Sequence, residues 1–329
     1  VTPYVLLVMH RLGLFKVLSN TSSMNLNTWL KIEVNPWRHN MNDNKVNITI
    51  NDVLHRVDEG RMLIEITDEL GIYIPRFCYH EKLSIAANCR MCLVEVENSS
   101  NALPACATPV TDGMIIDTLS HSTKTAQQST MEFLLINHPL DCPICDQGGE
   151  CELQDLAYAY GKNNSRFDLQ KLTKPNDDLG PLVSTDMTRC IMCTRCTRFG
   201  SEVAGIQELG TIGRGETSNI STFVKQTVNH ELSGNIIDLC PVGALNNKPY
   251  RYTDRTWEMD QIESVSPHDC VGTNLYMHVK NNKIKRIVPM QNEHINETWI
   301  ADRDRFGFDG IYSEDRLLTP LIRNNGTLI

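Results

Sequence analysis

The sequence has no long apolar run, no concentration of positive charge and few aromatic side chains. Nowhere in its 329 residues does a stretch approach the roughly 18 consecutive apolar residues that a membrane-spanning helix needs. The formal net charge is −9 and no stripe of Lys and Arg stands out, which argues against a nucleic-acid partner. Phe, Trp and Tyr make up 6%, but 41% hydrophobic residues are enough for the cores of two or three domains.

Cysteine is the residue type that the chain has in excess, with 12 residues. A count this high is compatible with disulfides, metal ions or metal clusters. Several of the cysteines lie in C-x2-C hooks, which favour metal, because thiols this close in sequence seldom form structural disulfides. Since metal-binding thiols must stay reduced, we expect a reducing compartment.

The sequence is organised around the segment H-P-L-D-C-P-I-C-D-Q-G-G-E-C, residues 138–151. Its cysteines, Cys142, Cys145 and Cys151, are spaced C-x2-C-x5-C, and His138 lies four residues upstream. The pair Gly148-Gly149 lets the backbone pass close to inorganic sulfide, a contact that tunes iron–sulfur potentials. The segment therefore predicts an iron–sulfur centre, and the alternative for this stretch alone is a zinc knuckle.

An earlier set of four cysteines lies in a region that predicts a small mixed sheet. Residues 45–50 alternate as a strand with Val46, Ile48 and Ile50 on one face, and the turn Asn51-Asp52 predicts a hairpin. A short helix is expected from Gly60 to Gly71, with Met62, Leu63, Ile66 and Leu70 on one side. Further strands are expected at 92–97 and 114–118. The spacing C-x10-C-x2-C-x13-C then predicts one [2Fe–2S] centre on Cys78, Cys89, Cys92 and Cys106. His80 is expected to be a loop residue, since four thiolates complete the site.

The third set carries the most specific pattern, C-x2-C-x2-C followed far downstream by C-P. This pattern, at Cys190, Cys193, Cys196 and Cys240, is typical of a [4Fe–4S] centre in bacterial ferredoxins. In two-cluster ferredoxins the distant cysteine serves the other cluster, so Cys240 could complete the central site instead. His138 makes this unnecessary, because it gives the central site its fourth ligand.

Helices are expected on both sides of the central segment. The first is predicted over 122–137, with Ser122 as its cap and Ala126, Phe133 and Leu134 on one face. The second follows Cys151 and ends at Gly161. Its inward residues are expected to be Leu153, Leu156 and Tyr160.

The remaining segments carry weaker predictions. Residues 162–185 are expected to be a polar connection, and G-T-I-G-R-G at 210–215 a plain loop rather than a nucleotide site. Two alternating strands are expected around Asn281-Asn282. Cys270, outside all three sets, is expected to be a small buried apolar residue, with a regulatory thiol as the alternative. Residues 1–44, where the first acid is Glu33, favour either a mitochondrial targeting sequence or an extension that packs on a partner.

Five segments together closely resemble the large iron–sulfur subunits of respiratory complex I, the NADH:ubiquinone oxidoreductase. They are I-P-R-F-C-Y-H, N-C-R-M-C-L-V-E-V, H-P-L-D-C-P-I-C-D-Q-G-G-E-C-E-L-Q-D, R-C-I-M-C-T-R-C-T-R-F and N-I-I-D-L-C-P-V-G-A-L. The resemblance runs from about Lys45 to the end. It implies one [2Fe–2S] cluster on Cys78, Cys89, Cys92 and Cys106, one [4Fe–4S] cluster on His138, Cys142, Cys145 and Cys151, and a second on Cys190, Cys193, Cys196 and Cys240.

In this family, electrons leave NADH through a flavin on a neighbouring subunit, pass along these clusters and continue to quinone. The resemblance thus implies an electron-transfer subunit with no hydride chemistry and no catalytic residue of its own. Its partners would be the flavin- and NADH-binding subunit and other peripheral-arm subunits, on the matrix side of the mitochondrial inner membrane, with neither nucleic acid nor a direct membrane span.

The implied fold is α+β in five parts. They are an extension (1–44), a [2Fe–2S] ferredoxin-like β-grasp domain (45–121), a helical and loop [4Fe–4S] domain with one histidine and three cysteine ligands (122–161), a [4Fe–4S] ferredoxin-like domain (162–250) and a truncated, β-rich start of a molybdopterin-oxidoreductase-like domain (251–329).

Two departures from the family pattern bear on these expectations. Some bacterial members carry an additional [4Fe–4S] centre. The positions that match its ligands here are Glu263, Ser266, Cys270 and about Ala301. Because only one of the four ligands remains, the chain looks like the mitochondrial form. The family also continues into a large domain, which here would be supplied by a second chain, be lost, or lie outside this sequence. The alternative host is an NAD-linked hydrogenase, through its diaphorase side, or an iron hydrogenase, through its ferredoxin-like arm. A zinc-stabilised scaffold is the alternative of a different class.

Overall fold

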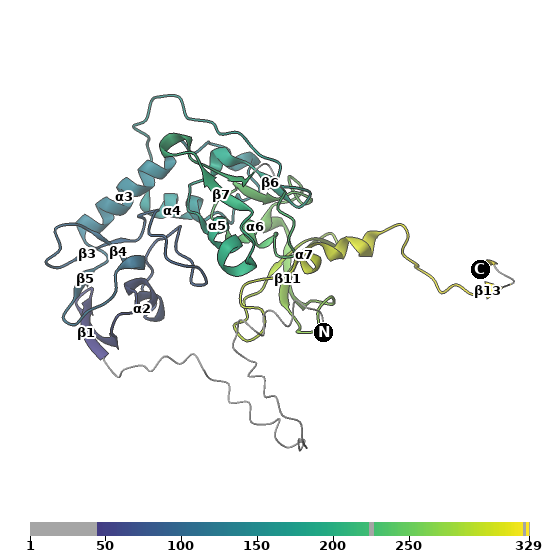
Figure 1. The fold of residues 1–329 in the computed structure, drawn as a ribbon, viewed down its shortest axis with the longest axis horizontal. Helices are drawn as coiled ribbons and strands as arrows, with labels where there is room; N and C mark the ends of the chain where they lie inside the picture. The colour runs from purple at the N-terminus through teal and green to yellow at the C-terminus, as the bar shows by residue number, and fades with distance from the viewer. Residues whose placement is uncertain (1–44, 224–226, 325–326, 329) are drawn as a thin grey trace, which may run out of the picture. The chain divides into compact units, whose positions relative to one another are not determined.

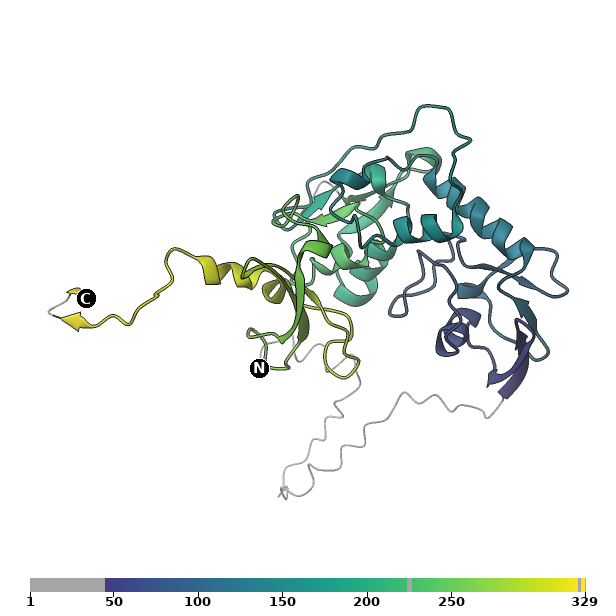
Figure 2. The same ribbon diagram turned by 180° about the vertical axis from the view of Figure 1, so that it is seen from behind.

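The computed structural model describes residues 45–223, 227–324 and 327–328, which belong to one compact unit. The predictions for residues 1–44 lie outside the described residues. Figures 1 and 2 show the described part from opposite sides, coloured along the chain. Among the described residues, no helix is both long and apolar enough to cross a lipid bilayer.

The first region is a five-stranded mixed sheet with the strand order β2-β1-β5-β3-β4. Its elements are β1 (Lys45–Ile50), β2 (Val53–Asp58), helix α2 (Leu63–Glu69), β3 (Leu93–Val96), β4 (Leu103–Pro104), the 3₁₀ turn η2 (Ala105–Ala107) and β5 (Ile115–Asp117). The predicted hairpin is confirmed, because Asn51 and Asp52 both have positive φ and join β1 to β2. Strand β5 pairs with β1 in parallel and with β3 antiparallel.

The core of this sheet follows the predicted alternation. Val46, Ile48 and Ile50 of β1 are all buried and pack with Leu63 and Ile66 of α2. Leu70 was expected on the same face of that helix. It is instead 39% exposed, because the helix ends at Glu69 before Gly71 reverses the chain with φ +71°.

Helix α3 (His121–Leu135) begins earlier than predicted. Its cap is Ser120, whose side chain accepts a hydrogen bond from the Thr123 backbone N–H, so the prediction of Ser122 as the cap is wrong. The prediction that Phe133 faces inward is also wrong, since its side chain is 75% exposed.

The physical reason is that α3 contacts the sheet through polar side chains. Thr123 accepts a hydrogen bond from the Glu95 backbone N–H at 2.9 Å, and Gln127 donates one to the Leu93 carbonyl at 3.1 Å. Helix α4 (Glu152–Tyr160), which contacts α3, has the predicted inward residues Leu153 and Leu156 buried and Tyr160 partly buried (Figure 1).

The next region consists of short elements around long loops. They are η3 (Cys142–Ile144), β6 (Val183–Thr185), η4 (Met187–Arg189), α5 (Arg195–Phe199), the π-helical turn η5 (Gly200–Ala204), β7 (Leu209–Ile212), η6 (Gly215–Thr217), β8 (Asn219–Thr222), α6 (Asn235–Leu239) and β9 (Leu245–Asn247). Strands β6 and β9 pair, as do β7 and β8. The plain loop predicted at 210–215 is therefore wrong in part, because Gly210 pairs with Ser221 inside a hairpin.

The last region contains a three-stranded antiparallel sheet. Its elements are η8 (Thr256–Glu258), β10 (Asp260–Val265), β11 (Asn274–Lys280), β12 (Lys283–Pro289), α7 (Asp302–Phe306), η9 (Gly307–Tyr312), β13 (Arg323–Asn324) and β14 (Thr327–Leu328). The predicted hairpin around Asn281 and Asn282 is confirmed, with positive φ at both residues.

Candidate metal centres

The four cysteines of the first set converge beside the five-stranded sheet. Cys78, Cys89, Cys92 and Cys106 are all buried, and Cys106 lies in the turn η2. Their thiols contact one another in three pairs, Cys78 with Cys89, Cys78 with Cys106, and Cys92 with Cys106. Hydrogen bonds within the group lower the pKa of Cys78 and Cys92 and raise that of Cys89 and Cys106, so two of the four thiols favour the thiolate, the form that binds iron.

The third set surrounds a single cavity. Cys190, Cys193, Cys196 and Cys240 all line it, and the other lining residues are mainly apolar. Burial raises the pKa of Cys193 and of Cys240 to about 12 and that of Cys190 to about 11. Four thiols in an apolar cavity stay protonated unless a cation stabilises their thiolates, and the iron of a cluster would supply that positive charge.

Backbone amides are directed at the sulfur atoms of this set. The Met192 N–H donates to Cys190 Sγ at 3.4 Å, and the Arg195 backbone N–H to the Cys193 thiol. Met192 and Thr194 both have left-handed φ, 56° and 59°, which turns successive amides toward the inside of the loop. Hydrogen bonds to sulfur are one of the means by which a protein raises the potential of an iron–sulfur centre.

The central set is more open. Cys145 and Cys151 are buried, Cys142 is exposed and His138 is partly buried. Burial, aided by the charges of Arg189 and Lys171, lowers the pKa of His138 to about 4, so its imidazole is neutral at pH 7 and able to bind metal.

Glycines allow close approaches around the central set. A Cβ atom on Gly149, which has φ +94°, would lie 2.6 Å from the Trp257 ring, and one on Gly148 would lie 3.1 Å from the Cys142 carbonyl oxygen. The closest approach to a side chain of this set is at Gly243, which lies in the segment N-I-I-D-L-C-P-V-G-A-L but for which no role was predicted. A Cβ atom there would lie 2.1 Å from Cys145 Sγ, so the loop after Cys240 packs directly on a thiol of the central set.

No three His, Cys, Asp or Glu side chains of the described residues are close enough to bind one metal ion together.

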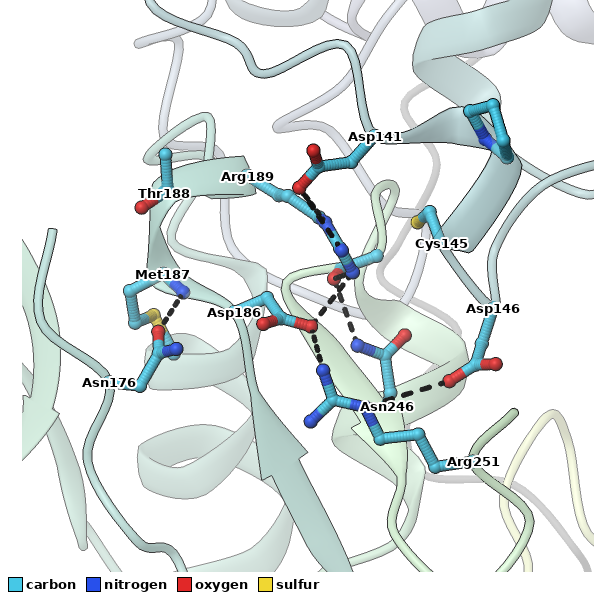
Figure 3. Close-up of polar contacts among 12 residues, drawn as sticks. Asp141, Cys145, Asp146, Asn176, Asp186, Met187, Thr188, Arg189, Asn246 and Arg251 are labelled. Carbon is cyan, nitrogen blue, oxygen red and sulfur yellow. Dashed lines mark hydrogen bonds and ion pairs between the residues drawn. The ribbon is translucent and has the colours of Figure 1, made fainter. Parts of the chain in front are cut away.

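Buried arginines connect the loops that carry the cysteines. Arg189, 4% exposed, forms ion pairs with Asp141 at 3.2 Å and Asp186 at 2.8 Å and donates to the Gly243 carbonyl at 3.3 Å (Figure 3). Arg251 also contacts Asp186, at 2.5 Å. Because Asp141 precedes Cys142 and Arg189 precedes Cys190, this network joins the central and third sets.

A second pair of arginines extends the connection to the first set. Arg195 donates to the Tyr79 carbonyl, next to Cys78, at 3.0 Å, and to Glu152, next to Cys151, at 2.7 Å. Arg198 donates to the Cys78 carbonyl at 2.5 Å and to the Cys193 carbonyl at 3.2 Å. Sequence reasoning missed these arginines, although the position of Arg195 between Cys193 and Cys196, and of Arg198 two residues after Cys196, was an available signal.

One buried core includes cysteines of all three sets, namely Cys78, Cys89, Cys151, Cys193, Cys196 and Cys240. The structure thus places cysteines of all three sets in one core. His80 stacks on Trp299, with ring centroids 5.7 Å apart.

Cys270 is exposed, so the prediction that it is a buried apolar residue is wrong. The neighbouring Asp269 carboxylate accepts backbone N–H groups of Val271 and Gly272, at 3.1 and 2.7 Å, which holds Cys270 in an exposed turn. Of the other positions matched to the additional bacterial centre, Ser266 is buried and donates to the Asp304 carboxylate, and Glu263 is exposed in β10.

Four family models match the chain in succession. They are described as 2Fe-2S iron-sulfur cluster binding domain (residues 43–121), NADH-ubiquinone oxidoreductase-G iron-sulfur binding region (127–166), NADH-quinone oxidoreductase subunit 3, ferredoxin-like domain (180–246) and NADH-ubiquinone oxidoreductase NDSU1/NuoG-like, 4Fe-4S domain (259–309). Within the last range, Cys270 is the only cysteine of the sequence.

Curated relatives agree with the family models. The NADH-ubiquinone oxidoreductase 75 kDa subunit of Reclinomonas americana is 52% identical over 281 residues, which are 85% of this chain and 40% of that protein. The corresponding NADH-quinone oxidoreductase subunit of Rickettsia felis, of the NuoG type, is 49% identical over 285 residues, 87% of this chain and 42% of that protein. The chain thus spans about 40% of the length of these relatives.

One solved structure is also similar. A chain of an NAD+-reducing [NiFe]-hydrogenase in the H2-reduced state superposes with a TM-score of 0.59 and is 28% identical, and the match covers 64% of this chain and 91% of that one.

Proposed function

Because the chain belongs to the family of the NADH-ubiquinone oxidoreductase 75 kDa subunit and its NuoG-type counterparts in NADH-quinone oxidoreductases, we propose that it relays electrons from NADH oxidation toward quinone. The observation that carries this proposal is the single buried core that includes cysteines of all three ligand sets. A relay needs its centres close together and shielded from water, and a shared core provides both.

The proposed assignment is one [2Fe–2S] cluster and two [4Fe–4S] clusters. The first set holds the [2Fe–2S] cluster, and each four-iron cluster has its own set, with His138 completing the central one. The four thiols around one cavity support Cys240 as the fourth ligand of the third set. The neutral state of His138 supports its role as a ligand.

When bound, the clusters supply one-electron chemistry. The chain's own residues hold the ligand loops in place, exclude water and set the local charge. Arg189 and Arg195 are paired with the carboxylates of Asp141 and Glu152, and these ion pairs join the segments that carry the cysteines. No residue is proposed to move a proton or a hydride.

The wider setting follows from the family. We propose that the chain works in the peripheral arm of a mitochondrial complex I, beside a subunit that binds flavin and NADH. Residues 45–121, with parallel neighbours β1 and β5 and the helix α2, are proposed to be a β-grasp domain, and the β10-β11-β12 sheet to begin a molybdopterin-oxidoreductase-like domain.

The test is metal and sulfide analysis of anaerobically purified protein together with EPR spectra of the reduced state. We expect about ten iron atoms per chain, little zinc, and three distinguishable signals. Stoichiometric zinc with little iron would overturn the assignment and support a zinc-stabilised scaffold.

A second candidate is the iron–sulfur part of an NAD-linked hydrogenase, which the hydrogenase match favours. The assembled native complex discriminates the two. Reduction of the clusters by NADH and their reoxidation by a quinone supports the first candidate, and reduction of NAD+ with H2 as the electron donor supports the second.

A further inference from the structure

Arg195 occupies an unusual place among the ligand loops. It lies on the five-residue helix α5 between Cys193 and Cys196, and its side chain is only 5% exposed. Helices α5 and α6, both labelled in Figure 1, contact each other, and Cys240 follows α6 directly. Arg195 thus lies where the segment that carries Cys193 and Cys196 meets the segment that carries Cys240.

The terminal nitrogens of Arg195 are fully used. One donates to Glu152 at 2.7 Å and to the Leu239 carbonyl at 3.4 Å, and the other to Glu152 at 3.1 Å and the Tyr79 carbonyl at 3.0 Å. These four bonds match the four N–H groups that the two nitrogens carry.

The fifth donor, Nε–H, is different. It is buried and has no hydrogen-bond partner among the described residues. An unsatisfied buried donor is destabilising, and more so when it is charged, which favours an acceptor for this N–H. Its position in the fold is beside the third set, because Arg195 lies between Cys193 and Cys196 in the chain and bonds to the carbonyl of Leu239, the residue before Cys240.

We propose that Arg195 donates its Nε–H to a sulfur atom of the centre held by Cys190, Cys193, Cys196 and Cys240, and so raises the reduction potential of that centre. This inference rests on the proposed function, since it needs a cluster in the third set. The sulfur atoms of a cluster accept hydrogen bonds, and such bonds, like nearby positive charge, favour the reduced state. Arg195 is a positioning residue that also tunes the centre.

Arg198 provides a matched control on the same helix. Its Nε donates to the Thr194 carbonyl at 3.3 Å, and its terminal nitrogens donate to the carbonyls of Cys78, Ser84 and Cys193. These bonds use four of its five N–H groups, all to backbone carbonyls, and its Nε–H is satisfied, so Arg198 lacks the buried, unpartnered Nε–H that distinguishes Arg195.

The experiment uses the holoprotein labelled with ¹⁵N-arginine. Pulsed EPR of the reduced third centre should detect a nitrogen coupling in the unaltered protein. The coupling should disappear in Arg195→Lys and persist in Arg198→Lys. In an EPR-monitored redox titration, the midpoint potential of the third centre should shift to more negative values in Arg195→Lys only, although lysine keeps the positive charge.

The outcomes separate the two proposals. Three cluster signals without a nitrogen coupling in the unaltered protein would overturn this inference and leave the proposed function standing, even if no variant folds. A coupling that persists in Arg195→Lys, or one found only at another centre, would also overturn it. Absence of iron–sulfur signals altogether would refute the proposed function itself.

Discussion

Replacing Gly243 by alanine tests whether the loop after Cys240 supports the central centre. The new Cβ atom would lie 2.1 Å from Cys145 Sγ and 3.2 Å from Gln147 Cβ. Carbon and sulfur cannot approach so closely, so either the loop or the thiol must move by more than 1 Å, on the order of the difference from van der Waals contact at about 3.5 Å. Cys145 would then leave its place in the ligand set.

Overpacking of this kind costs about 1–3 kcal/mol, which corresponds to a roughly five- to 150-fold lower affinity of the central set for its cluster. We expect Gly243→Ala to lose about four of its ten iron atoms and the EPR signal of the central centre, while the [2Fe–2S] signal is retained. Iron analysis and EPR of the purified variant measure both quantities.

Gly210→Ala is the matched control, because a Cβ atom at Gly210 would have no neighbour within 4 Å. It should keep its full iron content. If Gly243→Ala also keeps all its iron and an unchanged central signal, the packing of this loop on Cys145 is not needed for the centre, and the reasoning fails.

Three further predictions use the same measurements or a stability assay. His138→Ala should lose about four iron atoms and spare the EPR signals of the other two centres; three unchanged signals would refute the ligand assignment. If His138→Cys retains its cluster, the reduction potential of the central centre should be lower, because a thiolate adds negative charge. Cys270→Ser should leave the iron content unchanged, since the thiol is exposed and outside all three sets, and a loss of about four irons would reveal a further cluster. Burial and the charge of Arg286 lower the pKa of His278 to about 4, below its unfolded value of about 6.5. Because the folded state binds this proton less readily than the unfolded state, the free energy of unfolding should fall as the pH drops below about 6.5. Between pH 7 and pH 5.5 the free energy of unfolding, measured with urea, should fall by about 1 kcal/mol. The fall should be smaller in His278→Asn, and an equal fall would show that His278 does not cause it.

Local patterns predicted the elements whose cause is local. The two hairpins follow from Asn51-Asp52 and Asn281-Asn282, because Asn and Asp tolerate the positive φ that these turns require. The alternation of β1 gave the correct buried face. The separation of the twelve ligand residues into three sets stays a prediction, although the cavity around the third set supports it.

Features that depend on distant contacts could not be predicted in this way. Helix α3 buries Thr123 and Gln127, because their hydrogen bonds to β3 outweigh the apolar preference that pointed to Phe133. The partners of Arg195 include Tyr79, which is 116 residues away in the chain. No periodicity or spacing in the sequence encodes such a pairing.

The bonds of Arg195 to three separate segments also bear on how the protein opens. Release of the loop at Tyr79, of the start of α4 at Glu152 or of the end of α6 at Leu239 breaks a bond of the same guanidinium and leaves its buried charge less satisfied. Segments that share one buried cation cannot fluctuate independently, so they belong to one cooperative unit of local unfolding. Amide hydrogen exchange around the three centres should therefore report a common opening free energy, and damage that begins at one centre will loosen the protein around all of them.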